Sequence, residues 1–367
     1  MRHPRLKMGE AAALRWLAEA PLHHLATTRS DGTPVVRALQ GVLLGDWLLF
    51  HGSKAGEKSR CLGQPAVVSA ERVVANIPSY FIDPQYACPA TTLYVSAQAT
   101  GVLEDVTDPG SKAGFLAALM LKYQPEGGYA PLDPTVGDYR KAIKGVRVFG
   151  LRIQRVSGKS KLGQNKPTEY VERVLEGLWQ RGAPGDLEAM RELMELHPQA
   201  TPPPALRGPS GVHLEVSLRE TDRDVVLGLL AGQYWLKGIP PKVVWGAHQR
   251  STAWVGARLR THDGRLGSLI GTARALSDGS RLAHLSDVAV HSEHQSRGVG
   301  RALLRGLLDH PALRGVRTVS LTTTDKQSFY GHFGFCDATE LRYSFPLTLL
   351  VRTRQNVAYS ASSHAVR

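Results

Sequence analysis

A run of prolines near the middle of the chain divides it into two parts. The segment HPQATPPPALRGPSG, residues 197–211, contains five prolines. Proline fixes φ and removes a backbone donor, so this segment can continue neither a helix nor a central strand, and we expect an extended spacer. The chain has 367 residues, which is room for two domains of ordinary size. We therefore expect one domain over 1–196 and a second over 212–367, joined by a Pro-rich linker.

The first part of the chain is predicted to be mainly antiparallel strands. The dipeptides Asp31-Gly32 and Gly45-Asp46 each separate two apolar runs, which predicts two β-hairpins. Longer strand-like runs follow, and helical periodicity is limited to the N-terminus, residues 110–124 and residues 168–197. Many antiparallel strands with few helices predict a small barrel with flanking helices.

The second part alternates strands and helices, which predicts an α+β fold with a mixed sheet. At its centre a strand ends near Val290, and the loop Gln295–Gly300 leads into an apolar helix. The first N–H groups of a helix lack partners and lie at the positive end of its dipole, so such a loop can hold a phosphate or pyrophosphate. The alternative is that Gly298 and Gly300 only permit a tight connection. A dinucleotide fingerprint is excluded, because it requires a small residue at the position of Leu303.

The order of motifs over residues 211–346 resembles the GNAT acetyltransferase superfamily. Gln295-x-x-Gly298-x-Gly300 resembles the acetyl-CoA pyrophosphate loop of that family, and Tyr330-x-x-Phe333-Gly334-Phe335 resembles its second motif. The resemblance implies acetyl transfer from acetyl-CoA to a small-molecule amine, and it assigns a set of residues to acetyl-CoA. These are Val288, Ala289, Val290, Gln295, Ser296, Arg297, Gly298, Val299, Gly300 and Arg301.

The resemblance also implies catalytic roles. It assigns Tyr330 as the acid that protonates the departing thiolate; the alternative is an aromatic ring packing beside Phe333. Asp287 is the leading candidate for the base that accepts the proton of the amine, although a solvated or capping aspartate is the alternative. Weaker candidates are Asp278, His284 and Glu293, and Arg274 is either a clamp for an acidic acceptor or a solvated cation.

Residues 5–180 resemble the FMN-binding split β-barrels of pyridoxamine-phosphate-oxidase-like proteins. The segments that carry this resemblance are HLATTRSDGTPVVRAL, FHGSKAGEKS, ACPATTLYVSAQATG and KSKLGQNKP. The resemblance implies a homodimer with FMN at the subunit boundary. It assigns the flavin to Arg37, Leu39, His51, Gly52, Lys58, Ser96, Gln98, Lys161 and Gln164.

Two features leave the cofactor of this part open. Glu57 stands where some relatives of this family have a second cation, and His23, His24 and His51 are available as haem ligands. Residues 139–166 contain nine Lys or Arg and no acidic residue. Such a cluster requires an anion, a partner or open solvent. It is a candidate partner for the basic loop around Lys54.

Composition narrows the function classes. Cys61, Cys88 and Cys336 are odd in number and far apart, so we expect neither a disulfide framework nor a metal centre, and a reducing cytoplasm fits. No apolar run is long enough to cross a membrane. The net charge of +13 suggests nucleic acid, but the chain offers no reading helix, and CoA is itself a polyanion. We therefore expect an N-acetyltransferase fused to a flavin domain; the alternative is a flavin or haem sensor with a weakly active acetyltransferase domain.

Overall fold

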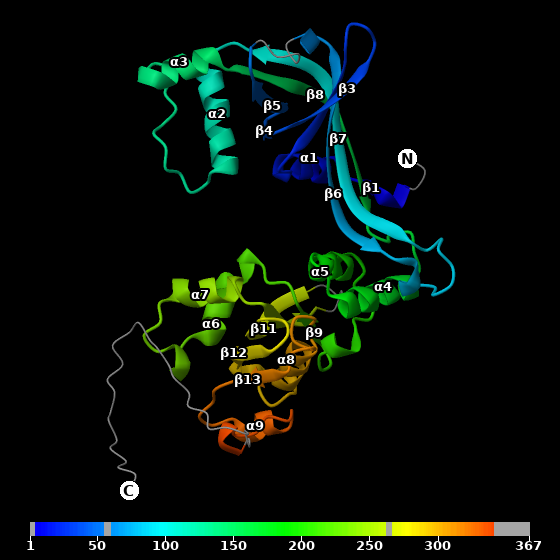
Figure 1. Cartoon of the computed structure of the whole chain (residues 1–367), viewed down its shortest axis with the longest axis vertical. Helices are drawn as coiled ribbons and strands as arrows, with labels where there is room; N and C mark the ends of the chain where they lie inside the picture. The colour runs from blue at the N-terminus through cyan, green and yellow to red at the C-terminus, as the bar shows by residue number, and fades with distance from the viewer. Residues whose placement is uncertain (1–3, 55–59, 262–265, 341–367) are drawn as a thin grey trace. The chain divides into compact units, whose positions relative to one another are not determined.

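The computed structural model describes residues 4–54, 60–261 and 266–340. The chain separates into a larger unit, Met1–Val319, and a smaller one, Ser320–Arg367. The larger unit contains two sheets and most of the helices (Figure 1).

The first sheet has eight strands, and every pairing assigned within it is antiparallel. Its order is β3-β2-β6-β7-β8-β5-β4, with β1 paired to β8. The strands are β1 Lys7–Met8, β2 His23–Thr28, β3 Pro34–Leu39, β4 Gly41–Leu44, β5 Trp47–Gly52, β6 Pro65–Ile77, β7 Thr91–Val106 and β8 Arg147–Lys161. Both predicted hairpins, β2–β3 and β4–β5, are present.

The long strands β6, β7 and β8 form the body of this sheet (Figure 1). Alternate residues of β7 are buried, as the sequence pattern predicts for a strand with one face on the core. The β7–β8 register shifts between Thr100 and Gly101. A Cβ at Gly101 would lie 1.8 Å from the Arg152 carbonyl oxygen, so only glycine allows this close approach of the two backbones.

Helices cover the first sheet and follow it. Helix α1 (Glu10–Glu19) buries Ala13 and Leu17 against the core, and α2 (Pro109–Tyr123) buries Phe115. Helix α3 (Gly137–Gly145) has only Ile143 buried, so its apolar pattern is too sparse to be read from the sequence, which assigns it no helix. The predicted helical segment before the linker forms α4 (Thr168–Arg181) and α5 (Asp186–Leu196).

The second sheet has five strands in the order β13-β12-β11-β10-β9. They are β9 Val212–Glu215, β10 Ala253–Arg260, β11 Leu266–Ser277, β12 Leu282–Val290 and β13 Thr318–Ser320. The helices of this part are α6 Arg223–Leu230, α7 Pro241–Gln249, α8 Val299–Leu308 and, in the smaller unit, α9 Gln327–Gly331. Leu303, Leu304 and Leu307 of α8 are fully buried. Helix α7 was not predicted from the sequence, whereas the rest of this order agrees with the predicted α+β fold.

The Pro-rich segment 197–211 is not the extended spacer that its prolines predict. Pro204–Leu206 forms a 3-10 turn, and Leu206 is fully buried. His197 is also buried, with Nε2 lying 3.0 Å from the Leu162 carbonyl oxygen, and Arg305 donates to the Arg207 carbonyl oxygen. Proline restricts φ but leaves apolar neighbours free to pack, and here that packing decides the conformation.

Among the described helices, none combines the length and apolar character of a membrane span.

Candidate functional site

A bulge in β12 opens the first candidate site. Thr272 of β11 pairs with Ala289, and Arg274 pairs with Ser286, so one residue of β11 faces two residues of β12. Asp287, inside this bulge, has a φ of 54°, in the left-handed region that non-glycine residues rarely adopt. A bulge bends the strand that contains it. Here the bend comes just before the Val288–Val290 segment that is assigned to acetyl-CoA.

The Asp287 carboxylate is held by two neighbours. Its Oδ2 lies 2.5 Å from Nε of Arg274, and its Oδ1 accepts a 3.0 Å hydrogen bond from Nε1 of Trp235. The Arg274 and Asp287 side chains are 12% and 3% exposed, so this ion pair lies away from water. Both carboxylate oxygens are therefore engaged, and Arg274 is neither a solvated cation nor a free clamp.

Two histidines feel the charges of this ion pair. Burial lowers the pKa of His284, and the Arg274 guanidinium lowers it further. Burial also lowers the pKa of His248, against the opposing effects of its hydrogen bond with the Val244 carbonyl and of the Asp287 charge. Both imidazoles are therefore neutral at pH 7.

The loop after β12 has the backbone of an anion site. Nε2 of Gln295 donates to the Val290 carbonyl oxygen at 3.0 Å, which ties the loop to the end of the strand. Ser296 (φ 58°) and Gly298 (φ 83°) are both left-handed. Left-handed residues next to right-handed ones turn successive N–H groups toward one concavity, the geometry that binds phosphate oxygens.

The start of α8 lacks the groups that normally neutralise a helix N-terminus. Its N-cap is Gly298, without a side-chain hydrogen bond, and its first turn contains no acidic residue. Arg297 and Arg301 are exposed beside it, whereas Val299 is buried and anchors the turn. The partial positive charge of the helix end and two cations therefore face an accessible loop. The residues assigned by resemblance fit a pyrophosphate.

The other catalytic candidates lie in different settings. Tyr330 belongs to α9 in the smaller unit; its ring lies edge-on to Phe329 with centroids 5.1 Å apart. Asp278 accepts hydrogen bonds from the N–H groups of Ser280, Arg281 and Leu282, so it caps the turn between β11 and β12. Glu293 is exposed.

One cluster of possible metal ligands was not predicted from the sequence. His291, Glu293 and His294 each offer a ligand atom within 4.8 Å of the others, between β12 and α8. His291 and Glu293 are exposed and His294 is half-buried. These residue types could hold a transition metal. The spacing H-x-E-H could have drawn attention to them.

The residues assigned to flavin fall into separate groups. His51 and Gly52 of β5 pair with Val148 and Arg147, at the start of β8. Lys161 is the last residue of β8 and pairs with Tyr94. At about 3.3 Å per residue, roughly 40 Å of strand separate these two ends.

The remaining flavin candidates lie between these ends or beside them. Ser96 and Gln98 of β7 pair with Lys159 and Ser157, nearer the Lys161 end, and Arg37 and Leu39 lie on β3. The Gln164 side chain is used locally, since it accepts from Leu162 N and donates to the Ser160 carbonyl oxygen. Lys58 lies outside the described residues. The described members of this set do not lie at a single place in one chain.

The histidines proposed as haem ligands differ in access. His23 is fully buried, with Nε2 2.7 Å from the Leu17 carbonyl oxygen and its ring edge-on to Phe50. It is a core residue. Nδ1 of His24 lies 2.9 Å from the Glu71 carboxylate. His51 is half-buried near the end of β5.

Comparisons with known proteins identify both parts. Residues 9–160 match the family described as pyridoxamine 5'-phosphate oxidase, and residues 230–335 match the acetyltransferase (GNAT) family. Most of each sheet lies within one of these two matched segments. The chain thus carries a pyridoxamine 5'-phosphate oxidase-like domain followed by a GNAT acetyltransferase domain, and both resemblances are confirmed.

Individual relatives match each part separately. An uncharacterized N-acetyltransferase, ycf52, of Gracilaria tenuistipitata var. liui is 32% identical over 83 residues, 22% of this chain and 46% of that protein. A GNAT-family acetyltransferase structure from Xanthomonas campestris pv. campestris is 33% identical and covers 38% of this chain and 93% of its own, with a TM-score of 0.31. The FAD and haem binding protein of Mycobacterium smegmatis is 26% identical over 42% of this chain and 71% of its own, with a TM-score of 0.35. The chain spans less than half the length of these two curated relatives: the one from Gracilaria and a putative acetyltransferase of Gibberella zeae.

Proposed function

We propose that the C-terminal domain transfers an acetyl group from acetyl-CoA to a small-molecule amine. The observation that carries this proposal is the start of α8, where a glycine N-cap, a left-handed Ser296 and the absence of acidic residues leave the helix end available to a pyrophosphate. Arg297 and Arg301 add charge that a neutral ligand would not need.

Different groups of the C-terminal domain serve the separate steps of the proposed acetyl transfer. The amine attacks the thioester carbonyl carbon, so that a C–N bond forms and the C–S bond breaks. The main chain of Val288–Val290, re-aimed by the bulge, polarises that carbonyl. The Tyr330 hydroxyl donates its proton to the thiolate. With both oxygens engaged by Arg274 and Trp235, Asp287 fixes the bulge. The proton that the amine loses passes to solvent water, from which Tyr330 regains the proton that it gave to the thiolate.

Replacement of Gly298 by alanine tests this proposal without an acceptor amine. A Cβ there would meet only Cγ of Pro209, at 3.5 Å, so the substitution adds backbone strain at φ 83° but no clash. Strain of about 1–2 kcal/mol turns the loop N–H groups away from the ligand. We expect roughly tenfold weaker acetyl-CoA binding by calorimetry.

Gly279→Ala is the matched control. Gly279 has a φ of 74° in the turn between β11 and β12, with open space around it, so it imposes similar strain elsewhere in the domain. Equal acetyl-CoA affinity in the wild type and Gly298→Ala would count against the pyrophosphate assignment.

We propose further that the N-terminal domain binds a flavin as a homodimer. The proposal rests on the family match and on the separation of the assigned residues along β8, which two chains in opposite orientation can overcome. A bound flavin would supply electron transfer to an oxidoreductase or to a redox sensor. We propose FMN as the cofactor, and haem is the alternative. Native mass spectrometry of unsupplemented protein tests both, since a dimer with two FMN masses is expected and an apo monomer would contradict it.

We also propose a cytoplasmic protein. Cys61 is a buried free thiol, and Cys88 and Cys336 are exposed free thiols. Exposed thiols persist in a reducing compartment.

A further inference from the structure

The turn that follows β12 brings two histidines to the same side of the backbone. His291 is the N-cap of a 3-10 turn, Ser292–His294, and the His294 N–H donates to the His291 carbonyl oxygen at 2.9 Å. A 3-10 helix has about three residues per turn, so side chains at i and i+3 lie one above the other. The two imidazole rings accordingly lie 6.0 Å apart between centroids, with an angle of 55° between their planes.

Glu293 adds a carboxylate to this pair, and we call the three residues the His–Glu–His turn. Each of them offers a ligand atom within 4.8 Å of the others. Within the part of the chain that the structure describes, no ion pair or side-chain hydrogen bond engages the Glu293 carboxylate. The carboxylates of Asp278 and Asp287 in the same sheet are, by contrast, engaged by neighbouring donors. Glu293 is therefore available as a ligand.

The backbone of the His–Glu–His turn is held at both ends. The His291 N–H donates to the Ile270 carbonyl oxygen of β11 at 2.8 Å. After the turn, Nε2 of Gln295 donates to the Val290 carbonyl oxygen at 3.0 Å. A bound ion would therefore have to order side chains alone, and preorganised ligands lose less conformational freedom on binding.

A tetrahedral metal ion fits the three ligands after small side-chain movements. Zinc binds nitrogen and carboxylate oxygen at about 2.0–2.2 Å, which places tetrahedral ligand atoms about 3.4 Å apart. The separations of at most 4.8 Å exceed this value by about 1.4 Å or less. His291 and Glu293 are exposed and His294 is half-buried, so the side chains can turn by this amount. Three protein ligands leave a fourth position to water.

The ligand types select the class of metal. Imidazoles with one carboxylate suit Zn²⁺ and neighbouring divalent transition metals, whereas Mg²⁺ and Ca²⁺ prefer oxygen ligands alone. The expectation of no metal centre was based on the number and spacing of the cysteines, and the His–Glu–His turn contains no cysteine.

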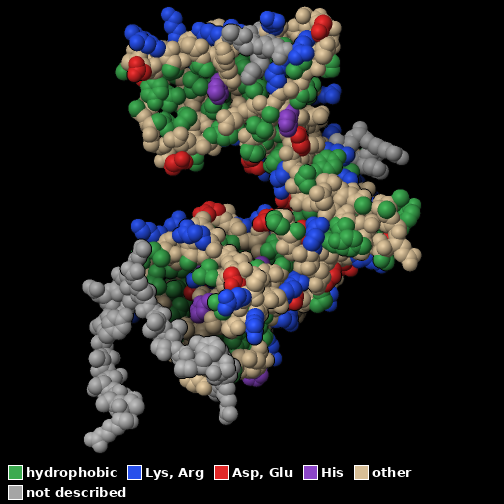
Figure 2. All heavy atoms as spheres, viewed as in Figure 1, with side chains coloured by type: hydrophobic (Ala, Val, Ile, Leu, Met, Phe, Trp, Pro, Cys, Tyr) green, Lys and Arg blue, Asp and Glu red, His purple; other side chains and the backbone are tan. Residues whose placement is uncertain are grey.

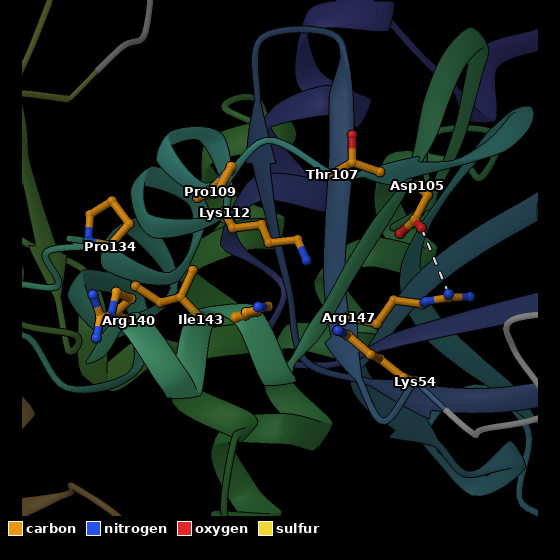
Figure 3. Close-up of a pocket in the computed structure, with 10 residues that line it drawn as sticks. Lys54, Asp105, Thr107, Pro109, Lys112, Pro134, Arg140, Ile143 and Arg147 are labelled. Atoms are coloured by element: carbon orange, nitrogen blue, oxygen red, sulfur yellow. Dashed lines mark ion pairs between the residues drawn. The ribbon is translucent and has the colours of Figure 1, made fainter. Parts of the chain in front are cut away.

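The positive charge of the chain is no obstacle at this turn. Lys and Arg are numerous and histidines few on the face that Figure 2 shows. The cavity in Figure 3 is lined by five Lys or Arg, and its one acidic residue, Asp105, lies 3.8 Å from Nη2 of Arg147, so that cavity repels a divalent cation. Arg297 and Arg301, which follow the His–Glu–His turn, are exposed, and 0.15 M salt screens exposed charges over about 8 Å.

We propose that the His–Glu–His turn binds one divalent transition metal ion, Zn²⁺ or an ion with the same ligand preference. His291, Glu293 and His294 are its three protein ligands. None of them belongs to the set assigned to acetyl-CoA, so the proposal stands or falls independently of the proposed acetyl transfer.

Calorimetry with Zn²⁺ alone tests the proposal in the full chain. The reference protein has no histidine tag and carries Cys88→Ser and Cys336→Ser, which remove the exposed thiols as competing ligands. Two variants are made in it: His291→Asn keeps an acceptor at the N-cap, and Glu293→Gln keeps the length of the side chain. His332→Asn, at an exposed histidine outside the turn, is the matched control, and circular dichroism melting checks each fold.

We expect one equivalent of Zn²⁺ to bind the reference protein and Mg²⁺ to bind much more weakly. Outer-shell partners of a metal ligand contribute about 10- to 100-fold to affinity, so loss of a ligand predicts at least about tenfold weaker Zn²⁺ binding. This weakening is expected in His291→Asn and in Glu293→Gln, but not in His332→Asn.

Three results would overturn the proposal. The first is a reference protein that binds no Zn²⁺, or binds Mg²⁺ as tightly. The second is equal Zn²⁺ affinity in the reference protein and His291→Asn. The third is weakening in His291→Asn without weakening in Glu293→Gln, because a histidine pair alone would account for it.

Discussion

The two candidate sites differ in how the chain brings their residues together. Ten residues assigned to acetyl-CoA lie within 288–301, and the structure keeps them on one strand end, one loop and one helix turn. The flavin residues are spread over strands β3, β5, β7 and β8, and the length of β8 separates them. A continuous motif builds its site locally, whereas a distributed set needs the tertiary fold and, in the homodimer that we propose, a second chain to complete it.

Mixed dimers test the distributed site most strongly. If each flavin site takes His51 from one chain and Lys161 from the other, homodimers of His51→Ala or Lys161→Ala lose both sites. A dimer with one chain of each variant regains one intact site. We expect almost no bound flavin in either variant alone and half-occupied mixed dimers, measured by flavin absorbance after differential-tag purification.

The contrasting outcome would place the site within one chain. Mixed dimers that stay empty mean that His51 and Lys161 do not complement each other across the interface. Wild-type flavin occupancy in the Lys161→Ala homodimer would remove Lys161 from the flavin-binding residues. Lys161 would then have a structural role, since its amine lies 2.5 Å from Oγ1 of Thr91.

The sequence predicted most of the fold because its signals were local. Asp31-Gly32 and Gly45-Asp46 mark turns that form as expected. Helices α3 and α7 were missed since α3 buries only Ile143 and α7 is short. The ion pair of Arg274 with Asp287 was not predictable, because it depends on a bulge that shifts the register of two strands by one residue.

The two domains are also expected to differ in how strongly acid destabilises them. Burial, followed by nearby arginines, lowers the pKa of both His213 and His310 to about 4. In the unfolded chain each titrates near 6.5. Between these values the unfolded state binds more protons, so the free energy of unfolding falls as the pH falls from 6.5 toward 4. From pH 7.5 to pH 5 we expect a loss of about 4 kcal/mol from the two residues together.

Hydrogen exchange resolved by peptide locates this loss. We expect faster exchange at pH 5, after correction for the intrinsic rate, mainly in β9, β10 and α8. The first sheet has His23, whose pKa is also lowered by burial, so it loses some stability as well. His213→Asn should flatten the pH dependence of the second sheet. A slope that His213→Asn and His310→Asn both leave unchanged would show that other groups govern acid unfolding.

A smaller effect than these two is expected at Tyr330, a catalytic candidate that lies outside the 288–301 segment. Tyr330→Phe keeps the ring that packs against Phe329 and Phe335 and removes only the hydroxyl. Loss of a general acid costs about 100-fold in rate, so kcat should fall by that factor while the KM for acetyl-CoA stays unchanged. Thiol release with an amine found by screening measures both. Tyr234→Phe, an exposed tyrosine of the same domain, is the control. An unchanged kcat in Tyr330→Phe would leave the residue with its packing role alone, and the thiolate would then take its proton from water.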